Sequence, residues 1–91
     1  MTLTVKWHRK GADQGNAPSQ YTLGVMYNFG NGVEQDYAEA YAWCNIAAES
    51  LPEAAHLRGE LGKLMSPQQL GEAQKRTRDL KALIEAKTKS Q

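Results

Sequence analysis

The sequence predicts an all-α protein, an α/α superhelix in which about five antiparallel helices stack and the last one caps the carboxyl end. Three observations predict this fold: apolar residues recur at steps of three and four, helix-capping residues precede these runs, and one segment recurs along the chain. The chain of 91 residues, 41% of them hydrophobic, is long enough for one domain with a small core. No strand is expected.

The repeated segment contains the two tryptophans. Trp7–Asp13 aligns with Trp43–Glu49 at a spacing of 36 residues, so that the tryptophan, an alanine and the following acidic residue all recur. Further along, Leu23-Gly24 matches Leu61-Gly62, which shifts the register by two residues. A period in the middle thirties is the length of one helix–turn–helix unit in a helical solenoid.

The first two helices can be placed from their ends. One is expected from about residue 3 to residue 12. The next follows Asn16, a residue type that accepts hydrogen bonds from the first amides of a helix, and it tolerates Pro18 in its first turn. This helix is expected to end at Phe29, because the glycines of Gly30-Asn31-Gly32 tolerate the positive φ that terminates helices.

Three later helices begin with a capping-box pattern, in which a short polar residue is followed three positions later by Glu or Gln. The pairs are Asp36 with Glu39, Ser50 with Glu53, and Ser66 with Gln69, the last with Pro67 at the first helical position. Three such starts in one short chain support the expectation of five helices.

Each expected helix has an apolar side at helical spacing. The members are Leu23, Gly24 and Tyr27; Ala40, Trp43 and Ala47; Ala54, Leu57, Leu61 and Leu64; and Leu70, Ala73, Thr77, Leu80 and Ile84. Trp43 and Tyr27 are expected in the core. Gly24 is expected to let a neighbouring helix approach closely. The last helix is polar on its other sides, as suits a lid on the stack.

Charge is distributed unevenly, although the formal net charge of +1 gives no global field that favours nucleic acid or an anionic membrane. Between Glu34 and Glu60, six acidic residues are opposed only by Arg58. Between Lys75 and Lys89, six basic residues accompany two acidic ones. Two solvated helix faces are the favoured interpretation. The alternative is a dipole that steers a partner or pairs two copies head to tail.

Cys44 is the only cysteine, which excludes an internal disulfide and fits a reducing compartment. It is expected to be a small buried hydrophobic residue. No apolar run resembles a secretory signal or a membrane span. A cytoplasmic protein is therefore predicted, with a periplasmic or secreted one as the alternative if an upstream signal is missing.

The pattern resembles the Sel-one-like repeat, a relative of the tetratricopeptide repeat. The similarity is strongest from Trp7 to Glu49, where the glycine loop, the aromatic positions and a double alanine have the family's spacing. The matching residues are Gly15-Asn16-Ala17, Gln20-Tyr21, Leu23-Gly24, Tyr27, Gly30, Gly32-Val33, Asp36-Tyr37, Ala40, Trp43 and Ala47-Ala48. The resemblance implies antiparallel helix pairs in a right-handed superhelix that serves mainly as an adaptor for protein complexes.

The resemblance also divides the single domain, residues 1–91, into a half repeat (3–15), a full repeat (16–50), a degenerate capping unit (51–87) and a tail (88–91). The last unit departs from the pattern because Ser66-Pro67 replaces its glycine loop. Stacked repeats usually need about three units to be stable. The open N-terminal face is therefore expected to be covered by upstream repeats or by a second copy, and a homodimer is predicted.

No catalytic, metal-binding or cofactor-binding constellation is predicted. His8 and His56 lack an HxxxH or CxxC companion, and the glycine loop lacks the Gly-Lys-Ser/Thr ending of a phosphate-binding loop. Some relatives have been described as penicillin-binding or β-lactamase-like, so a hydrolase of that kind is the alternative function. Such chemistry typically needs a serine with a lysine three residues later. The serines, none of which has one, are Ser19, Ser50, Ser66 and Ser90.

The predicted function is a non-enzymatic adaptor or scaffold that binds a protein or peptide. By resemblance, the first helix of each pair lines the concave groove. The positions this implies are Pro18, Tyr21, Val25, Asn28 and Phe29, with His56, Glu60 and Lys63 as a weaker set. Aromatic anchors and an amide suit a peptide. The alternative is that Tyr21, Val25 and Phe29 pack against a neighbouring helix or a second copy.

A third possibility is electrostatic binding of an acidic surface or nucleic acid. The residues for it are Lys75, Arg76, Arg78 and Lys81 on the last expected helix. The predicted partner is nevertheless neither nucleic acid nor a membrane.

Overall fold

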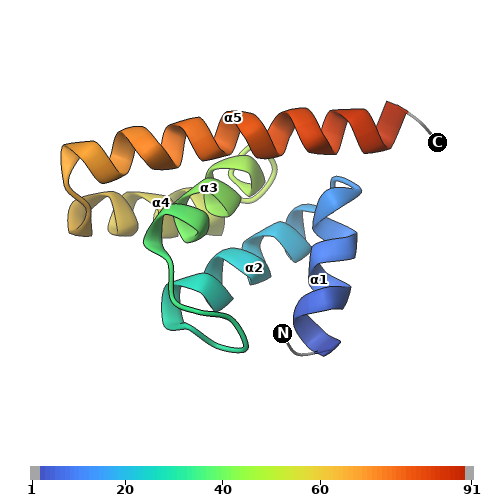
Figure 1. Ribbon diagram of the computed structural model, residues 1–91, viewed down its shortest axis with the longest axis horizontal. Coiled ribbons are helices and arrows are strands. Elements are labelled where there is room, and N and C mark those ends of the chain that lie inside the picture. Colours follow the sequence, from blue (N-terminus) through green and yellow to red (C-terminus); the bar gives the residue numbers. More distant parts are fainter. Residues whose placement is uncertain (1–2, 90–91) are drawn as a thin grey trace.

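The computed structural model describes residues 3–89, and within them the chain forms five α-helices and no strand (Figure 1). The helices are α1 (Leu3–Asp13), α2 (Ala17–Phe29), α3 (Tyr37–Ala47), α4 (Pro52–Leu64) and α5 (Pro67–Lys89). The prediction of an all-α superhelix is confirmed. Helix α5 continues to Lys89, so the predicted tail is helical at residues 88 and 89.

Helix α3 lies at the centre of the stack. It packs against α2 on one side and against α4 and α5 on the other, while α1 pairs with α2 and touches α5 (Figure 1). Helix α5 crosses the whole molecule, whose longest dimension is 38 Å, and covers α3 as the expected lid. The two ends of the stack are therefore α1 and the pair α4 and α5.

The ends of α2 and the start of α3 follow from local sequence. The Asn16 side chain accepts a hydrogen bond of 2.9 Å from the Ser19 amide at the start of α2. At its end Gly30 has φ 67° and its amide donates to the Met26 carbonyl, while Gly32 has φ 81°. The Asp36 carboxylate then accepts from two amides of α3. These predicted helix boundaries are confirmed.

The predicted capping boxes at Ser66 and Ser50 differ in outcome. At Ser66 the box is complete, because the serine hydroxyl accepts from the Gln69 amide and the Gln69 side chain accepts from the Ser66 amide. At Ser50 the prediction is wrong, since Leu51 is the N-cap of α4 and no side chain caps it. The Ser50 amide instead donates to the Ala47 carbonyl and closes the end of α3, while Pro52 starts α4 with its fixed φ.

The core forms around α3 in two clusters. Trp43 is fully buried in the first cluster, beside Val5 of α1, Leu23 of α2 and Leu80 of α5. The second cluster consists of Ala40, Cys44 and Leu61, with the side chains of four tyrosines and Leu57 packed around it. Most of the predicted apolar sides are buried. Leu64 is the exception, since 64% of it is exposed at the end of α4.

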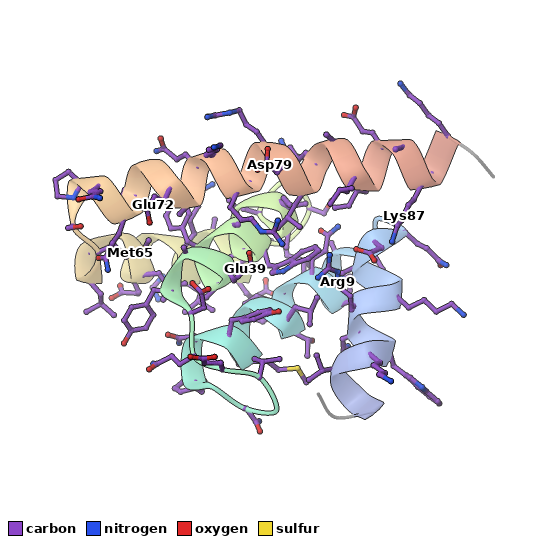
Figure 2. The ribbon with its side chains drawn as sticks, viewed as in Figure 1. Arg9, Glu39, Met65, Glu72, Asp79 and Lys87 are labelled. Carbon is purple, nitrogen blue, oxygen red and sulfur yellow. The ribbon has the colours of Figure 1, made fainter. Side chains whose placement is uncertain are left out.

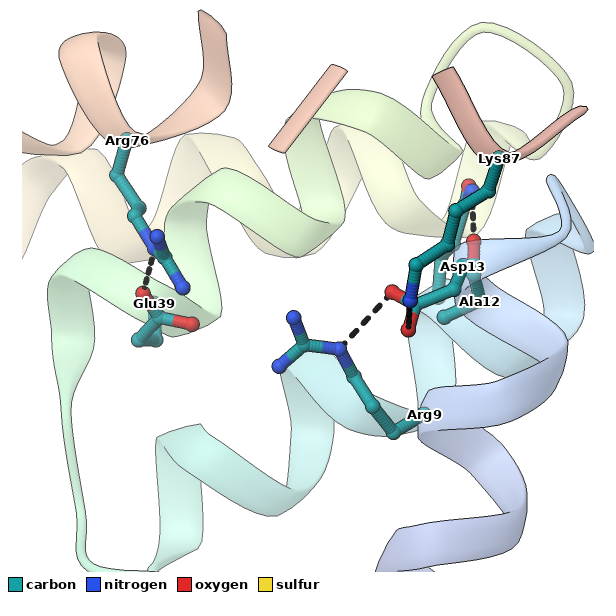
Figure 3. Close-up of polar contacts among 7 residues, drawn as sticks. Arg9, Ala12, Asp13, Glu39, Arg76 and Lys87 are labelled. Carbon is teal, nitrogen blue, oxygen red and sulfur yellow. Dashed lines mark hydrogen bonds and ion pairs between the residues drawn. The ribbon is translucent and has the colours of Figure 1, made fainter. Parts of the chain in front are cut away.

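Charged side chains of α5 bind acidic residues of α1, of α3 and of the turn after α3 (Figures 2 and 3). Arg76 pairs with Glu39, Lys81 pairs with Glu49 at 2.5 Å, and Lys87 pairs with Asp13 at 2.8 Å. The side chains of Lys81, Glu49 and Lys87 remain 44%, 65% and 55% exposed, as the interpretation of solvated faces expects, whereas those of Glu39 and Asp13 are only 14% and 13% exposed. Glu39 was also expected to complete a capping box with Asp36, and its carboxylate is oriented towards Arg76 instead. These ion pairs connect α5 to α1 and to the α3 region, and being partly exposed they add little to the stability that burial of Leu80 provides.

Asp13 pairs with Lys87 of α5 and also with Arg9 of its own helix, at 2.9 Å (Figure 3). Burial raises the pKa of this carboxyl, but the hydrogen bonds from Lys87 and Arg9 outweigh it, so its pKa lies below the ordinary 3.8. A depressed pKa in the folded state stabilises the fold above the unfolded pKa and loses this contribution as the pH falls through the folded value.

We expect Asp13→Asn to lower the free energy of unfolding by about 1 kcal/mol at neutral pH, because Lys87 is half exposed and screened. The difference between the wild type and the variant should shrink as the pH falls below 3.8. Urea unfolding followed by circular dichroism at several pH values measures it. A difference that stays constant down to pH values well below 3.8 would contradict this role of Asp13.

Candidate protein-binding surface

Helix α2 has one packed side and one outer side. Gln20, Leu23 and Gly24 are buried on the packed side. The predicted site residues lie on the outer side, because their spacing of three, four and three or four residues returns to one face of a helix. We call this set the α2 outer face, and it consists of Pro18, Tyr21, Val25, Asn28 and Phe29. The helical geometry thus brings all five together on one element.

The α2 outer face combines exposed and half-buried side chains. Phe29 is 73% exposed at the end of the helix, and Pro18 is exposed at its start. Val25 and Asn28 are half-buried between them. Most of an aromatic ring is therefore presented to solvent, at one end of a row of apolar side chains.

Tyr21 belongs partly to the core. Its side chain packs against the second cluster, formed by Ala40, Cys44 and Leu61. The alternative of packing against a neighbouring helix therefore holds for Tyr21, which leaves only part of its ring to a partner. It does not hold for Phe29, which is among the most exposed large hydrophobic residues of the described chain.

Both ends of α2 are fixed by hydrogen bonds. The buried Gln20 side chain donates to the Ala12 carbonyl at 3.1 Å, which ties the start of α2 to the end of α1. At the other end the Gln35 side chain donates to the Asn28 carbonyl at 2.8 Å, which ties the glycine loop to the last turn. A surface on such a helix is ordered before a partner arrives, and less ordering entropy is lost on binding.

The weaker predicted set lies on α4. His56, Glu60 and Lys63 are all exposed, and Lys63 pairs with Glu60 at 3.6 Å within the same helix. An exposed pair at this distance contributes little to stability and is open to exchange with a partner's charges. The structure thus presents these residues to solvent without joining them to the α2 outer face.

A cavity of about 530 Å³ between the glycine loop and α5 was not predicted from the sequence. Its lining includes Tyr27, Asp36, Glu39 and Arg76. Burial raises the pKa of the Tyr27 hydroxyl, and the nearby Glu39 carboxylate adds to this effect. Because Arg76 is already paired with Glu39, the net charge that the cavity offers a ligand is negative, from Asp36. The sequence gave no local signal for the cavity, because Arg76 and Glu39 are 37 residues apart in the chain.

The predicted basic set on α5 is divided by its contacts. Arg76 and Lys81 pair with Glu39 and Glu49 of the α3 region, whereas Lys75 and Arg78 are exposed. Two of the four cations therefore serve the fold. Those two are already compensated by carboxylates, so they attract phosphates less than free cations would.

The side chains that were considered as candidates for catalysis or metal binding show no arrangement for either among the described residues. The Ser66 hydroxyl accepts a capping hydrogen bond, and Ser90 lies outside the described residues. Among residues 3–89, no group of three or more His, Cys, Asp or Glu side chains could hold a metal ion. None of the described helices is long and apolar enough to cross a membrane.

Cys44 is fully buried, as predicted, and burial raises the pKa of its thiol to about 12. Since the thiolate is the reactive form, we expect native Cys44 to react with Ellman's reagent at pH 8 about a thousandfold more slowly than the unfolded chain. A raised pKa also means that this group stabilises the fold below its unfolded pKa of 9.0 and that the contribution is lost at higher pH. Equal rates for the native and the guanidinium-unfolded chain would contradict this placement of the thiol.

The chain was also compared with known proteins. The family model of the Sel1 repeat matches residues 2–16 and 17–50, which together are more than half of the chain. The second match spans α2 and α3, and the first spans α1. No curated protein matches the sequence. The resemblance inferred from the sequence is confirmed, and the chain belongs to the Sel1 repeat family.

Proposed function

We propose that this protein is a non-enzymatic adaptor whose α2 outer face binds a segment of another protein. Sel1 repeats are generally protein-interaction modules, which gives the class of function. The position of the surface is our inference from the described residues. It places the binding site on the first helix of the full helix pair.

The observation that supports the proposal is the exposure of Phe29 beside other apolar side chains. An aromatic ring that is 73% exposed has most of its apolar area still to lose from water. Val25 lies one turn before it and Pro18 three turns before it on the same side of α2. Rigid aromatic anchors of this kind dominate the energetics of protein interfaces. Peptide segments commonly bind such rows of side chains on helical surfaces.

Phe29→Ala is therefore expected to weaken binding of the partner strongly. Partners are first captured from cell extract with the wild-type chain, and their affinities are then measured with purified proteins by calorimetry. Loss of an exposed aromatic anchor should cost about 2 kcal/mol of binding free energy, or roughly a thirtyfold higher Kd. Phe29 is chosen over Tyr21 because Tyr21 packs against the core, where truncation would also affect folding.

Leu83→Ala is the matched control. Leu83 is a large hydrophobic residue of α5 that is 47% exposed, so its truncation removes apolar surface of similar character elsewhere. We expect the partner's affinity for this variant to equal that for the wild type. A partner that binds Phe29→Ala as tightly as the wild type, or that loses affinity only with Leu83→Ala, would refute the proposed surface.

A further inference from the structure

Two equivalent positions of the repeat have opposite surroundings. Trp43 in α3 is fully buried, while Trp7, 36 residues earlier in α1, is 72% exposed. The difference extends to the residues beside them. We call the exposed set on α1 the Trp7 face, and it consists of Lys6, Trp7 and Lys10, where α3 has Ala42, Trp43 and Ile46. The α3 set is buried throughout.

Trp43 is covered by helices from two other parts of the stack. Val5 of α1 and Leu80 of α5 lie in the same core cluster. The Arg9 guanidinium of α1 also lies over the indole ring, 5.2 Å from its centroid. At this repeat position of α3, the tryptophan is therefore buried by α-helices that pack across it.

Nothing in the described chain covers the equivalent Trp7. Helix α1 forms one edge of the molecule (Figure 1), and the ring of Trp7 borders a shallow hollow of about 420 Å³. Lys10, Gly11 and Gln14 line the remainder of this hollow. The Trp7 face thus offers one large apolar side chain with space beside it.

The two lysines determine which helix fits. In α3 the neighbours of the tryptophan are the apolar Ala42 and Ile46, which accept the apolar sides of α1 and α5. On α1 the corresponding ammonium groups of Lys6 and Lys10 would be desolvated against an apolar helix, which is costly without partners. A helix with carboxylates at its margins would pair with both and still cover the ring.

We propose that the Trp7 face binds an acidic amphipathic helix of a partner protein. Trp7 is the apolar anchor, and Lys6 and Lys10 form salt bridges with carboxylates that flank the partner's apolar stripe. A second copy of this chain, expected from the sequence as the other occupant, fits less well. In a twofold pairing of α1 with α1, four lysines would face one another across the interface.

The test follows the indole N–H signals of the ¹⁵N-labelled full chain during titration with two synthetic helical peptides of about five turns. Both carry the same alanine and leucine stripe, flanked by glutamates in one and by lysines in the other. We expect the glutamate peptide to shift the Trp7 signal while the Trp43 signal stays in place. The lysine peptide should bind at least about tenfold more weakly.

Variants of exposed residues make the test specific. Trp7→Ala lacks the reporting indole, so its affinity for the glutamate peptide is measured by calorimetry beside that of the wild type. It should bind about tenfold or more weakly, as expected for loss of an aromatic anchor. The double variant Lys6→Glu, Lys10→Glu should reverse the preference between the two peptides. The matched control Lys75→Glu, Arg78→Glu changes two exposed cations of α5 and should bind like the wild type. Unchanged thermal melting shows that each variant is folded.

Five results would overturn the inference. They are absence of glutamate-peptide binding, binding that Trp7→Ala leaves unchanged, loss of binding in Phe29→Ala, a Trp7-dependent dimer in sedimentation, and tighter binding of a single-stranded oligonucleotide than of the peptide at the Trp7 signal. The inference is independent of the α2 outer face. Phe29→Ala should leave glutamate-peptide binding unchanged. If this variant loses the binding, the peptide binds at α2 and the inference about Trp7 fails, while the proposed function of the α2 outer face is unaffected.

Discussion

Replacement of Trp43 by alanine is expected to lower the free energy of unfolding by about 3–5 kcal/mol. The side chain is fully buried and shares a cluster with Val5, Leu23 and Leu80, so it joins α1, α2 and α5 to the central α3. Domains of this size are stabilised by only about 5–15 kcal/mol in total. Urea unfolding monitored by circular dichroism measures the loss, and the variant should be unfolded or close to it at 37 °C.

Trp7→Ala is the control for this prediction, because it removes the same side chain from an exposed position of the repeat. We expect a change within about 0.5 kcal/mol, as for most surface substitutions. Trp43→Phe provides a second comparison, since it keeps an aromatic ring and removes a buried indole N–H that has no acceptor among the described residues. It should cost less than Trp43→Ala. Equal losses for Trp7→Ala and Trp43→Ala would contradict the different surroundings of the two tryptophans.

The second large effect is expected for Gly24→Ala, which should destabilise the fold by about 2–3 kcal/mol. A Cβ atom at this position would lie 2.5 Å from the Cys44 sulfur and 3.2 Å from the Ala40 carbonyl oxygen. Helices α2 and α3 would therefore have to separate. This cost exceeds the roughly 1 kcal/mol that alanine gains over glycine within a helix.

Gly59→Ala is the matched control, because Gly59 is also inside a helix and a Cβ atom there would meet nothing within 4 Å. We expect it to stabilise the protein by up to about 1 kcal/mol. Adding Cys44→Ala to Gly24→Ala removes the closest clash, so the double variant should lose less than the sum of the two single losses. Thermal melting that gives Gly24→Ala the same gain as Gly59→Ala would contradict the close approach of α2 and α3.

The features predicted correctly from the sequence are those that depend on neighbouring residues. Asn16, Asp36 and Ser66 cap their helices through amides two or three positions away, so their roles follow from local geometry. The stop at Gly30 is also local. Gly24 and Trp43 were placed on the packed sides of their helices from helical spacing, and both are buried.

The features that the sequence did not predict depend on contacts between distant segments. Glu39 has the spacing of a capping box, but Arg76, on another helix, competes for its carboxylate. Leu64 has the spacing of its helix's apolar side, yet it lies in the last turn of α4, where 64% of it is exposed. The repeat likewise equated Trp7 with Trp43, although only the second has helices on both sides. Such outcomes are decided by which elements are neighbours in space.

For the candidate site, too, the sequence predicted the local geometry but not the contacts between helices. The spacing of its five residues places them on one side of α2, because a helix has a fixed period. The spacing did not show that Tyr21 packs against the core while Phe29 remains exposed, since this depends on where the cluster of Ala40, Cys44 and Leu61 meets α2. The cavity beside Arg76 gave no sequence signal for the same reason, and the uneven distribution of charge did not show which cations of α5 pair with which carboxylates.

The most direct test of the proposed binding surface is a cross-saturation measurement on the labelled chain in complex with a captured partner. Protons of the unlabelled partner are saturated, and the loss of amide signal on this chain maps the residues that the partner contacts. We predict the strongest losses at Tyr21, Val25 and Phe29, with little change along the exposed side of α5. Losses confined to α5, with the signals of α2 unaffected, would contradict the account.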